Sequence, residues 1–179
     1  MSGHNKWSKV KNKKAVTDAK KSRIFSKISK LIASESKAAA GNTDSPNLRA
    51  AIEKAKSVNM PSDNIDRAVK KGVSGVEASL ESSLYEAYAH GGSALLIETL
   101  SDNRNRTSAE IKHLLLEGGA SIAAPGSAVW AFEKTSSGWE AKTSAPISPK
   151  DAKNLENLLE ELEENNDVQD VYTNAKTDE

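Results

Sequence analysis

Cysteine is absent from the 179 residues of the chain. Without it the protein has no disulfide bond, no thiolate nucleophile and no zinc site with Cys ligands. Nothing in the sequence therefore requires an oxidising compartment. Aromatic residues are also few, with three Trp, three Tyr and two Phe. The hydrophobic cores must be small and mostly aliphatic.

Long apolar runs are missing as well. The longest, such as residues 94–97, fall far short of the roughly 20 apolar residues that a membrane-spanning helix needs. No apolar signal-peptide core follows the basic start of the chain. We therefore expect a cytoplasmic protein without a membrane partner. A mitochondrial transit peptide is the alternative, but such segments favour Arg and exclude acids, whereas this one is rich in Lys and contains Asp18.

Motifs of the common enzyme classes are not found. The sequence has no P-loop, no glycine fingerprint for dinucleotides and no nucleophile elbow. Its histidines, His4, His90 and His113, lie far apart, and none belongs to an HxxxH zinc pair. We interpret His113 as a helix-surface residue and His90 as a turn residue. The sequence predicts a protein that is not an enzyme and needs no cofactor or metal.

Charge is divided unevenly along the chain although its formal net charge is zero. Residues 1–72 hold 17 Lys and Arg against 6 Asp and Glu, whereas residues 73–179 hold 8 against 19. Such a split indicates one part that attracts polyanions and another that repels them.

The first part of the chain predicts three helices joined by short links. The first begins at Thr17 or Asp18, runs towards Ala40 and stops at Gly41. The second begins at Pro46 and ends near residue 59, and the third runs from residue 61 to a stop at Gly72. Residues 1–73 should form a basic helical domain, and the Gly-, Ser- and Glu-rich residues 74–83 a linker.

The second part predicts an α/β domain over residues 84–175 and a polar tail over 176–179. Two strands around the His90–Gly92 turn should precede a helix that Thr107 caps, with Glu110 completing a capping box. Two further strands, a helix capped by Ser148 and a closing strand should follow. The fold class is α+β: a three-helix module followed by a small β-β-α-β-α-β two-layer domain of ferredoxin-like type. The expected strands span residues 84–88, 94–100, 127–135, 139–143 and 168–172.

The basic opening carries the strongest functional signal, because clustered cations gain free energy when they displace counterions from a phosphate backbone. Trp7 lies among these cations and can stack on a base, or it can anchor the segment to the helices. A lysine-rich helix face can also be merely solvated. The candidate nucleic-acid-binding residues here are Lys6, Trp7, Lys9, Lys11, Lys13, Lys14, Lys20, Lys21 and Arg23.

Arg104 and Arg106 form a second candidate site, directly before the predicted start of a helix. The free N–H groups of a helix start carry partial positive charge, so two arginines beside them would make an anion-binding corner for phosphate. In the alternative, Asp102 ties up the loop and the arginines pair with acids such as Glu98.

An acidic helix is expected from Asp151 to Asp167, and it would repel nucleic acid. It should face solvent or a basic partner. The charge split suggests the hypothesis that this helix masks the basic N-terminal segment until nucleic acid competes for it.

Three stretches of the sequence resemble the YebC family: GHNKWSKVKNKKAVTDAKKSRIFSKI, YEAYAHGGSALLIETLSDNRNRTSAEIKH and LLEELEENNDVQDVYTN. The resemblance implies a helical N-terminal domain followed by α/β domains, and a role as a probable DNA-binding transcriptional regulator; some relatives instead activate translation. Asn5 and Ala89–His90 depart from the family pattern. The segment between Phe132 and the acidic helix is much shorter than usual, which implies a shortened member that lacks one α/β domain.

We therefore predict a nucleic-acid-binding regulatory protein that controls transcription through DNA. The alternative is a translational activator that binds RNA or the ribosome, since no cluster of Arg, Asn and Gln lies on an evident recognition helix. A protein-interaction adaptor and an enzyme that binds an anionic substrate at Arg104 and Arg106 are further alternatives. The sequence does not indicate an oligomeric state.

Overall fold

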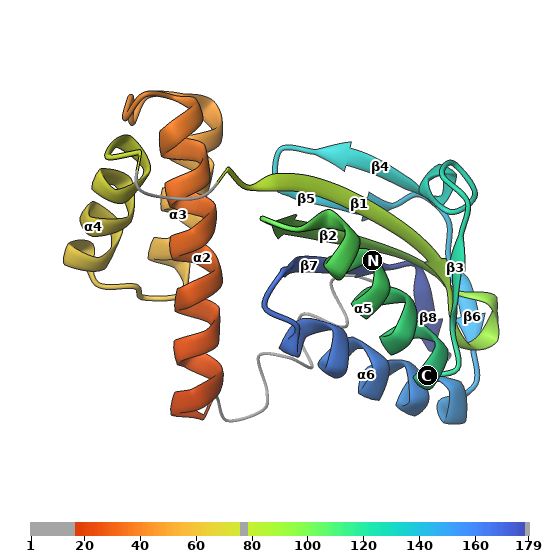
Figure 1. Ribbon diagram of the computed structural model, residues 1–179. Helices are drawn as coiled ribbons and strands as arrows, with labels where there is room; N and C mark the ends of the chain where they lie inside the picture. The colour runs from red at the N-terminus through yellow and green to blue at the C-terminus, as the bar shows by residue number, and fades with distance from the viewer. Residues whose placement is uncertain (1–16, 76–78, 178–179) are drawn as a thin grey trace. The chain divides into compact units, whose positions relative to one another are not determined.

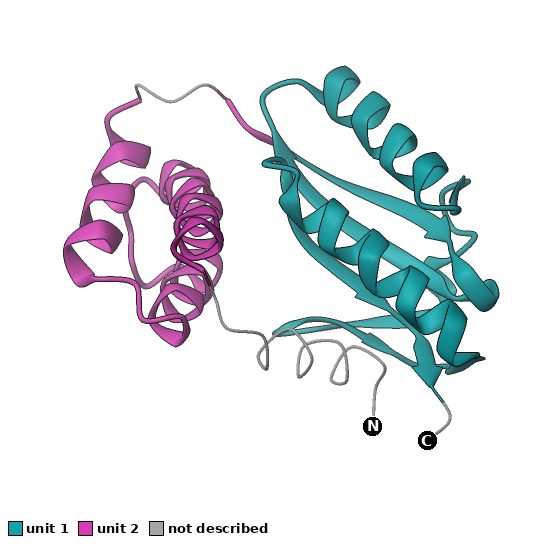
Figure 2. Ribbon diagram, turned by 90° about the horizontal axis from the view of Figure 1, so that it is seen from below, with its two compact units in different colours: residues 1–15, 82–179 teal, residues 16–81 magenta. Residues whose placement is uncertain are grey.

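The computed structural model describes residues 17–75 and 79–177. The chain divides into two compact units, which Figure 2 colours separately. One unit is Val16–Glu81, which we call the helical unit; the other is Met1–Ala15 with Ser82–Glu179, and we call its described part the α/β unit. Among the described residues, no helix has both the length and the apolar character that crossing a membrane requires.

Three helices build the helical unit, as the sequence predicts (Figure 1). The Thr17 side chain caps the first helix by accepting a hydrogen bond from the backbone N–H of Lys20. Buried aliphatic side chains from all three helices, such as Ile32, Leu48 and Ile65, form its core. The helices are α2 (Asp18–Ala38), α3 (Pro46–Ser57) and α4 (Ser62–Val73).

Gly72 does not stop the third helix, so that prediction is wrong. The residue is buried inside α4, which runs on to Val73. A Cβ atom at Gly72 would lie 2.3 Å from the carbonyl oxygen of Ala33 and 2.8 Å from the Cβ of Ser36. Glycine is required here because α2 and α4 approach each other closely. The Ser36 hydroxyl adds a hydrogen bond of 2.7 Å to the carbonyl of Val69.

A four-stranded sheet in the order β3-β1-β2-β7 forms the centre of the α/β unit. The expected α+β fold class is confirmed. Strand β3 pairs antiparallel with β1, and β7 pairs antiparallel with β2. The strands are β1 (Glu81–Tyr88), β2 (Ala94–Ser101), β3 (Ser121–Ala123) and β7 (Val168–Thr173).

The two faces of this sheet are covered by different elements. Helices α5 (Arg104–Glu117) and α6 (Pro149–Glu164) lie on one face, where Leu95, Ile111 and Leu158 share a core. The antiparallel hairpin of β4 (Phe132–Thr135) and β5 (Gly138–Ala141) lies on the other face, where it packs against residues such as Leu96. Figure 1 shows the two helices and the hairpin on opposite sides of β1 and β2.

Some expected elements are corrected by the structure. Residues Val129–Ala131 form a 3-10 turn, η2, and the strand expected over 127–135 begins only at Phe132. The sequence did not predict the short strands β3, β6 (Ala145–Ile147) and β8 (Ala175–Thr177), of which the last two pair in parallel. Strands of three residues carry little periodicity, so only their pairing partners define them.

Candidate nucleic-acid interface

Five cations line one face of α2. They are separated by three, four, three and seven residues. Because an α-helix has 3.6 residues per turn, residues at these intervals lie on one face. The buried residues Ile28, Ile32 and Ser36 occupy a different face. We call this feature the cationic row: Lys20, Arg23, Lys27, Lys30 and Lys37.

Two of the predicted binding residues, Lys20 and Arg23, belong to the cationic row, whereas Lys21 does not. Lys21 is exposed on another side of α2, and its Nζ lies 6.0 Å from the centre of the Phe25 ring. The sequence analysis did not include Lys27, Lys30 and Lys37 among its candidates. Their spacing of three, four and seven residues was the signal that could have identified them.

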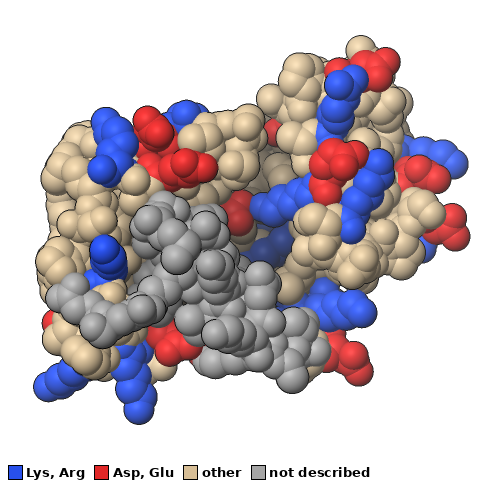
Figure 3. All heavy atoms as spheres, turned by 180° about the vertical axis from the view of Figure 1, so that it is seen from behind, with Lys and Arg blue, Asp and Glu red and all other residues tan. Residues whose placement is uncertain are grey.

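Two cations of α3 pair with acidic side chains. Arg49 pairs with Asp44 at 3.3 Å, and Lys56 pairs with Glu53 at 2.9 Å. Figure 3 likewise shows Lys and Arg interspersed with Asp and Glu on the side of the molecule that it presents. These two pairs place compensating negative charge beside cations of α3.

The predicted site residues in the opening segment, Lys6, Trp7, Lys9, Lys11, Lys13 and Lys14, lie outside the described residues. Their role in binding nucleic acid stays a prediction.

Helix α5 starts four residues earlier than the sequence analysis expected. Its cap is Asn103, whose side-chain oxygen accepts a hydrogen bond of 3.1 Å from the backbone N–H of Arg106. The prediction of Thr107 as the cap is wrong, because Thr107 is fully buried within the first turns of α5. Arg104 is the first residue of the helix and is exposed.

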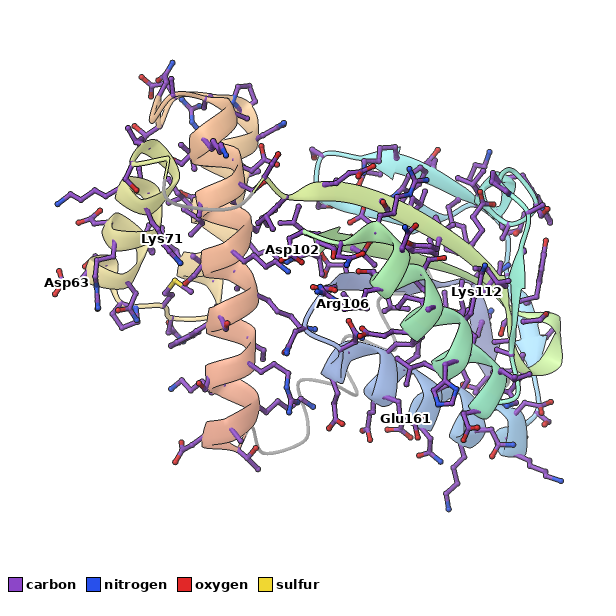
Figure 4. All side chains as sticks on the ribbon, in the orientation of Figure 1. Asp63, Lys71, Asp102, Arg106, Lys112 and Glu161 are labelled. Atoms are coloured by element: carbon purple, nitrogen blue, oxygen red, sulfur yellow. The ribbon has the colours of Figure 1, made fainter. Side chains whose placement is uncertain are left out.

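Carboxylates surround the Arg106 guanidinium. Its Nη2 lies 2.8 Å from Asp167 and 3.0 Å from Asp102, and its Nε lies 3.9 Å from Glu110. The hydrogen bond to Asp167, together with the one to Asp102, raises the pKa of Arg106. Figure 4 shows Arg106 and Asp102 together at the start of α5. Arg106 therefore has internal counterions.

Asp167 is the buried centre of this network. Besides Arg106, its Oδ2 accepts hydrogen bonds from the hydroxyls of Thr107 at 2.8 Å and Ser101 at 3.2 Å. The network joins the end of β2 and the start of α5 to the loop before β7. Glu98, the acid suggested as an arginine partner, instead pairs with Lys134 at 3.1 Å.

The histidines have the structural positions that the sequence analysis gave them. His113 is exposed on α5, and His90 lies in the 3-10 turn η1 (His90–Gly92) between β1 and β2. In the ranges 17–75 and 79–177, no group of three or more Asp, Glu or His side chains is arranged to hold a metal ion.

Two family models match nearly the whole chain. The TACO1/YebC protein N-terminal domain matches residues 5–75, and the TACO1/YebC second and third domain matches residues 80–138 and 133–175. The chain belongs to the TACO1/YebC family.

Several curated relatives of this family member are called probable transcriptional regulatory proteins. One from Fervidobacterium nodosum is 48% identical over 136 residues, which cover 75% of this chain and 54% of the relative. In this match, which covers only part of both proteins, the chain spans about half the length of the relative. One from Thermoanaerobacter pseudethanolicus is 35% identical over 240 positions, covering 98% of this chain and 97% of the relative. These names support a regulatory role for the family.

A solved structure supports the fold assignment. A conserved hypothetical protein from Aquifex aeolicus superimposes with a TM-score of 0.79 at 28% sequence identity. The match covers 90% of this chain and 93% of that one.

The family member described here is shortened, as the sequence comparison implied. The Thermoanaerobacter alignment runs over 240 positions, more than the 179 residues of this chain, so that relative carries residues that this one lacks. The two segments matched by the second family model meet at residues 133–138. The turn of the β4–β5 hairpin lies at this point of the chain.

Proposed function

We propose that this family member is a nucleic-acid-binding regulator of transcription, and that the helical unit makes the contact. The cationic row on α2 carries this proposal, because aligned Lys and Arg side chains can follow a line of phosphates. Arg23, Lys27, Lys30 and Lys37 already have interactions of their own within the protein, so phosphate would compete with these. The lysines at positions 6, 9, 11, 13 and 14 add positive charge to the same contact.

The proposed contact reads the backbone and not the sequence. The cationic row consists of Lys and Arg, and the exposed side of α2 adds Ser, without the Asn and Gln that read adenine in the major groove. This composition also supports the second candidate function, a translational activator that binds RNA or the ribosome. RNA helices are recognised mostly by shape and by contacts to phosphates and 2′-hydroxyls.

Arg104 and Arg106 are less suited to this contact. Arg106 already has three carboxylates within 4 Å, and phosphate would have to displace at least one of them. The proposal therefore depends on the helical unit.

Salt titrations of binding test the proposal. We expect affinity for duplex DNA to fall with salt, and each phosphate contact adds about −0.9 to the log-log slope. Replacing Lys20, Arg23, Lys27 and Lys30 together by Gln should make the slope shallower by about 3.6. Gln has a helix propensity close to that of Lys and Arg, so α2 should stay folded, which circular dichroism can check.

The matched control removes four exposed lysines from the α/β unit, namely Lys112, Lys150, Lys153 and Lys176. This control should leave the slope unchanged. An equal loss in both variants would show that net charge alone drives binding and would refute the role of the cationic row. Parallel titrations with single-stranded RNA and purified ribosomes separate the two functions: stable ribosome binding near physiological salt, without preference for duplex DNA, would favour the translational one.

A further inference from the structure

Trp130 is the most conspicuous exposed side chain of the α/β unit. It lies in η2, directly before β4, and 55% of its surface is exposed. A single exposed aliphatic residue is ordinary on a protein surface, but Trp is the residue type most enriched at the energetic centres of protein interfaces.

A buried carboxylate holds the loop that carries Trp130. Glu86, on β1, is only 7% exposed and accepts three backbone hydrogen bonds, from Gly126 at 2.6 Å, Ala128 at 2.7 Å and Val129 at 2.8 Å. Burying a carboxylate is costly unless such donors satisfy it. These hydrogen bonds hold the loop in one position. The loop would therefore lose little conformational entropy when a partner binds.

The orientation of the indole ring is also fixed. Its N–H donates to the carbonyl of Ser127 at 2.7 Å and lies 3.2 Å from the Tyr88 hydroxyl. Tyr88 itself donates to the same Ser127 carbonyl. The polar edge of Trp130 is thus satisfied within the unit, and its exposed surface is apolar.

Two exposed glutamates of the β4–β5 hairpin lie close to Trp130. Glu133 follows Trp130 by three residues, so their Cα atoms are at most about 11 Å apart. Glu140 is directly opposite Glu133 in the β4–β5 pair, and both are exposed. Neither glutamate forms an ion pair with a described residue, and the neighbouring Lys134 instead pairs with Glu98 at 3.1 Å. Like charges directly opposite each other destabilise a strand pair, so this pair lowers the stability of the hairpin.

We propose that Trp130, Glu133 and Glu140 form a docking surface for a second copy of this chain, and that the partner copy contributes the cationic face of its helical unit. A Lys or Arg side chain placed over an indole ring gains a cation–π interaction, and the adjacent glutamates supply its counterions. Lys142 directly follows β5 and is exposed, so Glu133, Glu140 and Lys142 together carry one net negative charge.

Charge complementarity favours a second copy over nucleic acid as the occupant. The unit Val16–Glu81 holds 12 Lys and Arg against 8 Asp and Glu, whereas the other unit, Met1–Ala15 with Ser82–Glu179, holds 13 against 17. An acidic unit repels a polyanion and attracts the basic unit of another copy. Two copies can each offer their helical unit to the other, and such a reciprocal arrangement closes as a two-fold dimer. The inference needs no nucleic acid and stands independently of the proposed function.

Sedimentation and light scattering of the full chain, without nucleic acid, test this inference. We expect the wild-type mass to rise from monomer to dimer with concentration at low salt, and high salt to reverse the rise. Trp130→Ala should raise the dimer dissociation constant about tenfold or more. Glu133→Gln combined with Glu140→Gln should weaken the dimer while leaving the thermal midpoint of the unit unchanged or higher. Leu116→Ala removes a side chain that is 75% exposed on α5 and should dimerise like the wild type.

A chain that stays monomeric at every concentration and salt level would overturn the inference. So would a dimer that Trp130→Ala and Leu116→Ala weaken equally. Single-stranded oligonucleotides provide the last arm of the test: if Trp130→Ala lowers affinity for a single strand and leaves self-association unchanged, Trp130 is a base-stacking residue and the dimer proposal is wrong.

Discussion

Replacing Glu86 by Gln tests whether one buried carboxylate specifies the loop before β4. In the wild type, Oε2 accepts from the backbone N–H groups of Ala128 and Val129, and Oε1 accepts from Gly126. Glutamine keeps one acceptor oxygen, but its NH₂ group must then face an N–H donor. One donor is left unsatisfied in a buried site, which costs about 1–3 kcal/mol. For a unit of this size the thermal midpoint should fall by at least about 4 °C.

The same substitution should change the pH dependence of stability. Burial alone raises the pKa of Glu86, but the hydrogen bonds from Gly126, Ala128 and Val129 outweigh it and hold the pKa below its ordinary value of 4.5. The folded state therefore binds fewer protons than the unfolded chain around this pH. The stabilisation is present above pH 4.5 and is lost as the pH falls through the folded-state pKa. The difference in stability between wild type and Glu86→Gln should shrink in acid.

Thermal unfolding followed by tryptophan fluorescence measures both effects. A Trp7→Phe background leaves Trp130 and Trp139 of the α/β unit as reporters. The control Glu161→Gln removes an exposed carboxylate from α6 and should move the midpoint little. An equal midpoint for wild type and Glu86→Gln at neutral pH, or a difference that does not shrink in acid, would refute the reasoning.

Two further predictions concern close packing and the network around Asp167. Gly72→Ala should destabilise the helical unit by about 1–3 kcal/mol in chemical denaturation, because the added Cβ would meet the backbone of Ala33. The control Ala50→Gly, at an exposed site of α3, should cost only about 1 kcal/mol. No loss of stability in Gly72→Ala would contradict the observed approach of α2 and α4. Thr107→Val should cost about 1–3 kcal/mol by removing a donor from buried Asp167, and this cost should disappear in an Asp167→Ala background, which removes the acceptor. Additive effects of the two substitutions would mean that Thr107 acts in some other way.

Signals confined to a few neighbouring residues predicted the fold well. Thr17 and Ser148 are the caps of α2 and α6 because a side-chain oxygen at the first position of a helix accepts from a backbone N–H three residues later. Such a signal depends on adjacent residues alone. The same logic failed at α5, where Asn103 and Thr107 are both capable caps. Burial of Thr107 against Asp167, which is distant in the sequence, decided between them.

The candidate site was only partly predictable for the same reason. Lys20 and Arg23 were identified from local charge, and helical spacing extends their row to Lys37. Arg106 has the same local character, yet its Asp167 partner is 61 residues away. No spacing rule connects these two residues. Their meeting depends on α5 and the loop before β7 packing at the same end of the sheet.

By itself the sequence determined the division of charge, the helical caps and the absence of cysteine chemistry, because each of these depends on composition or on residues within one helical turn. Only the tertiary structure decided that Gly72 is a packing contact, that Arg106 has internal counterions, and that a fixed Trp130 is left exposed. These outcomes depend on which distant surfaces share the limited buried volume of each unit. Hydrophobic burial is not directional, so the pattern of apolar residues specifies that a face is buried but not which polar groups are enclosed with it.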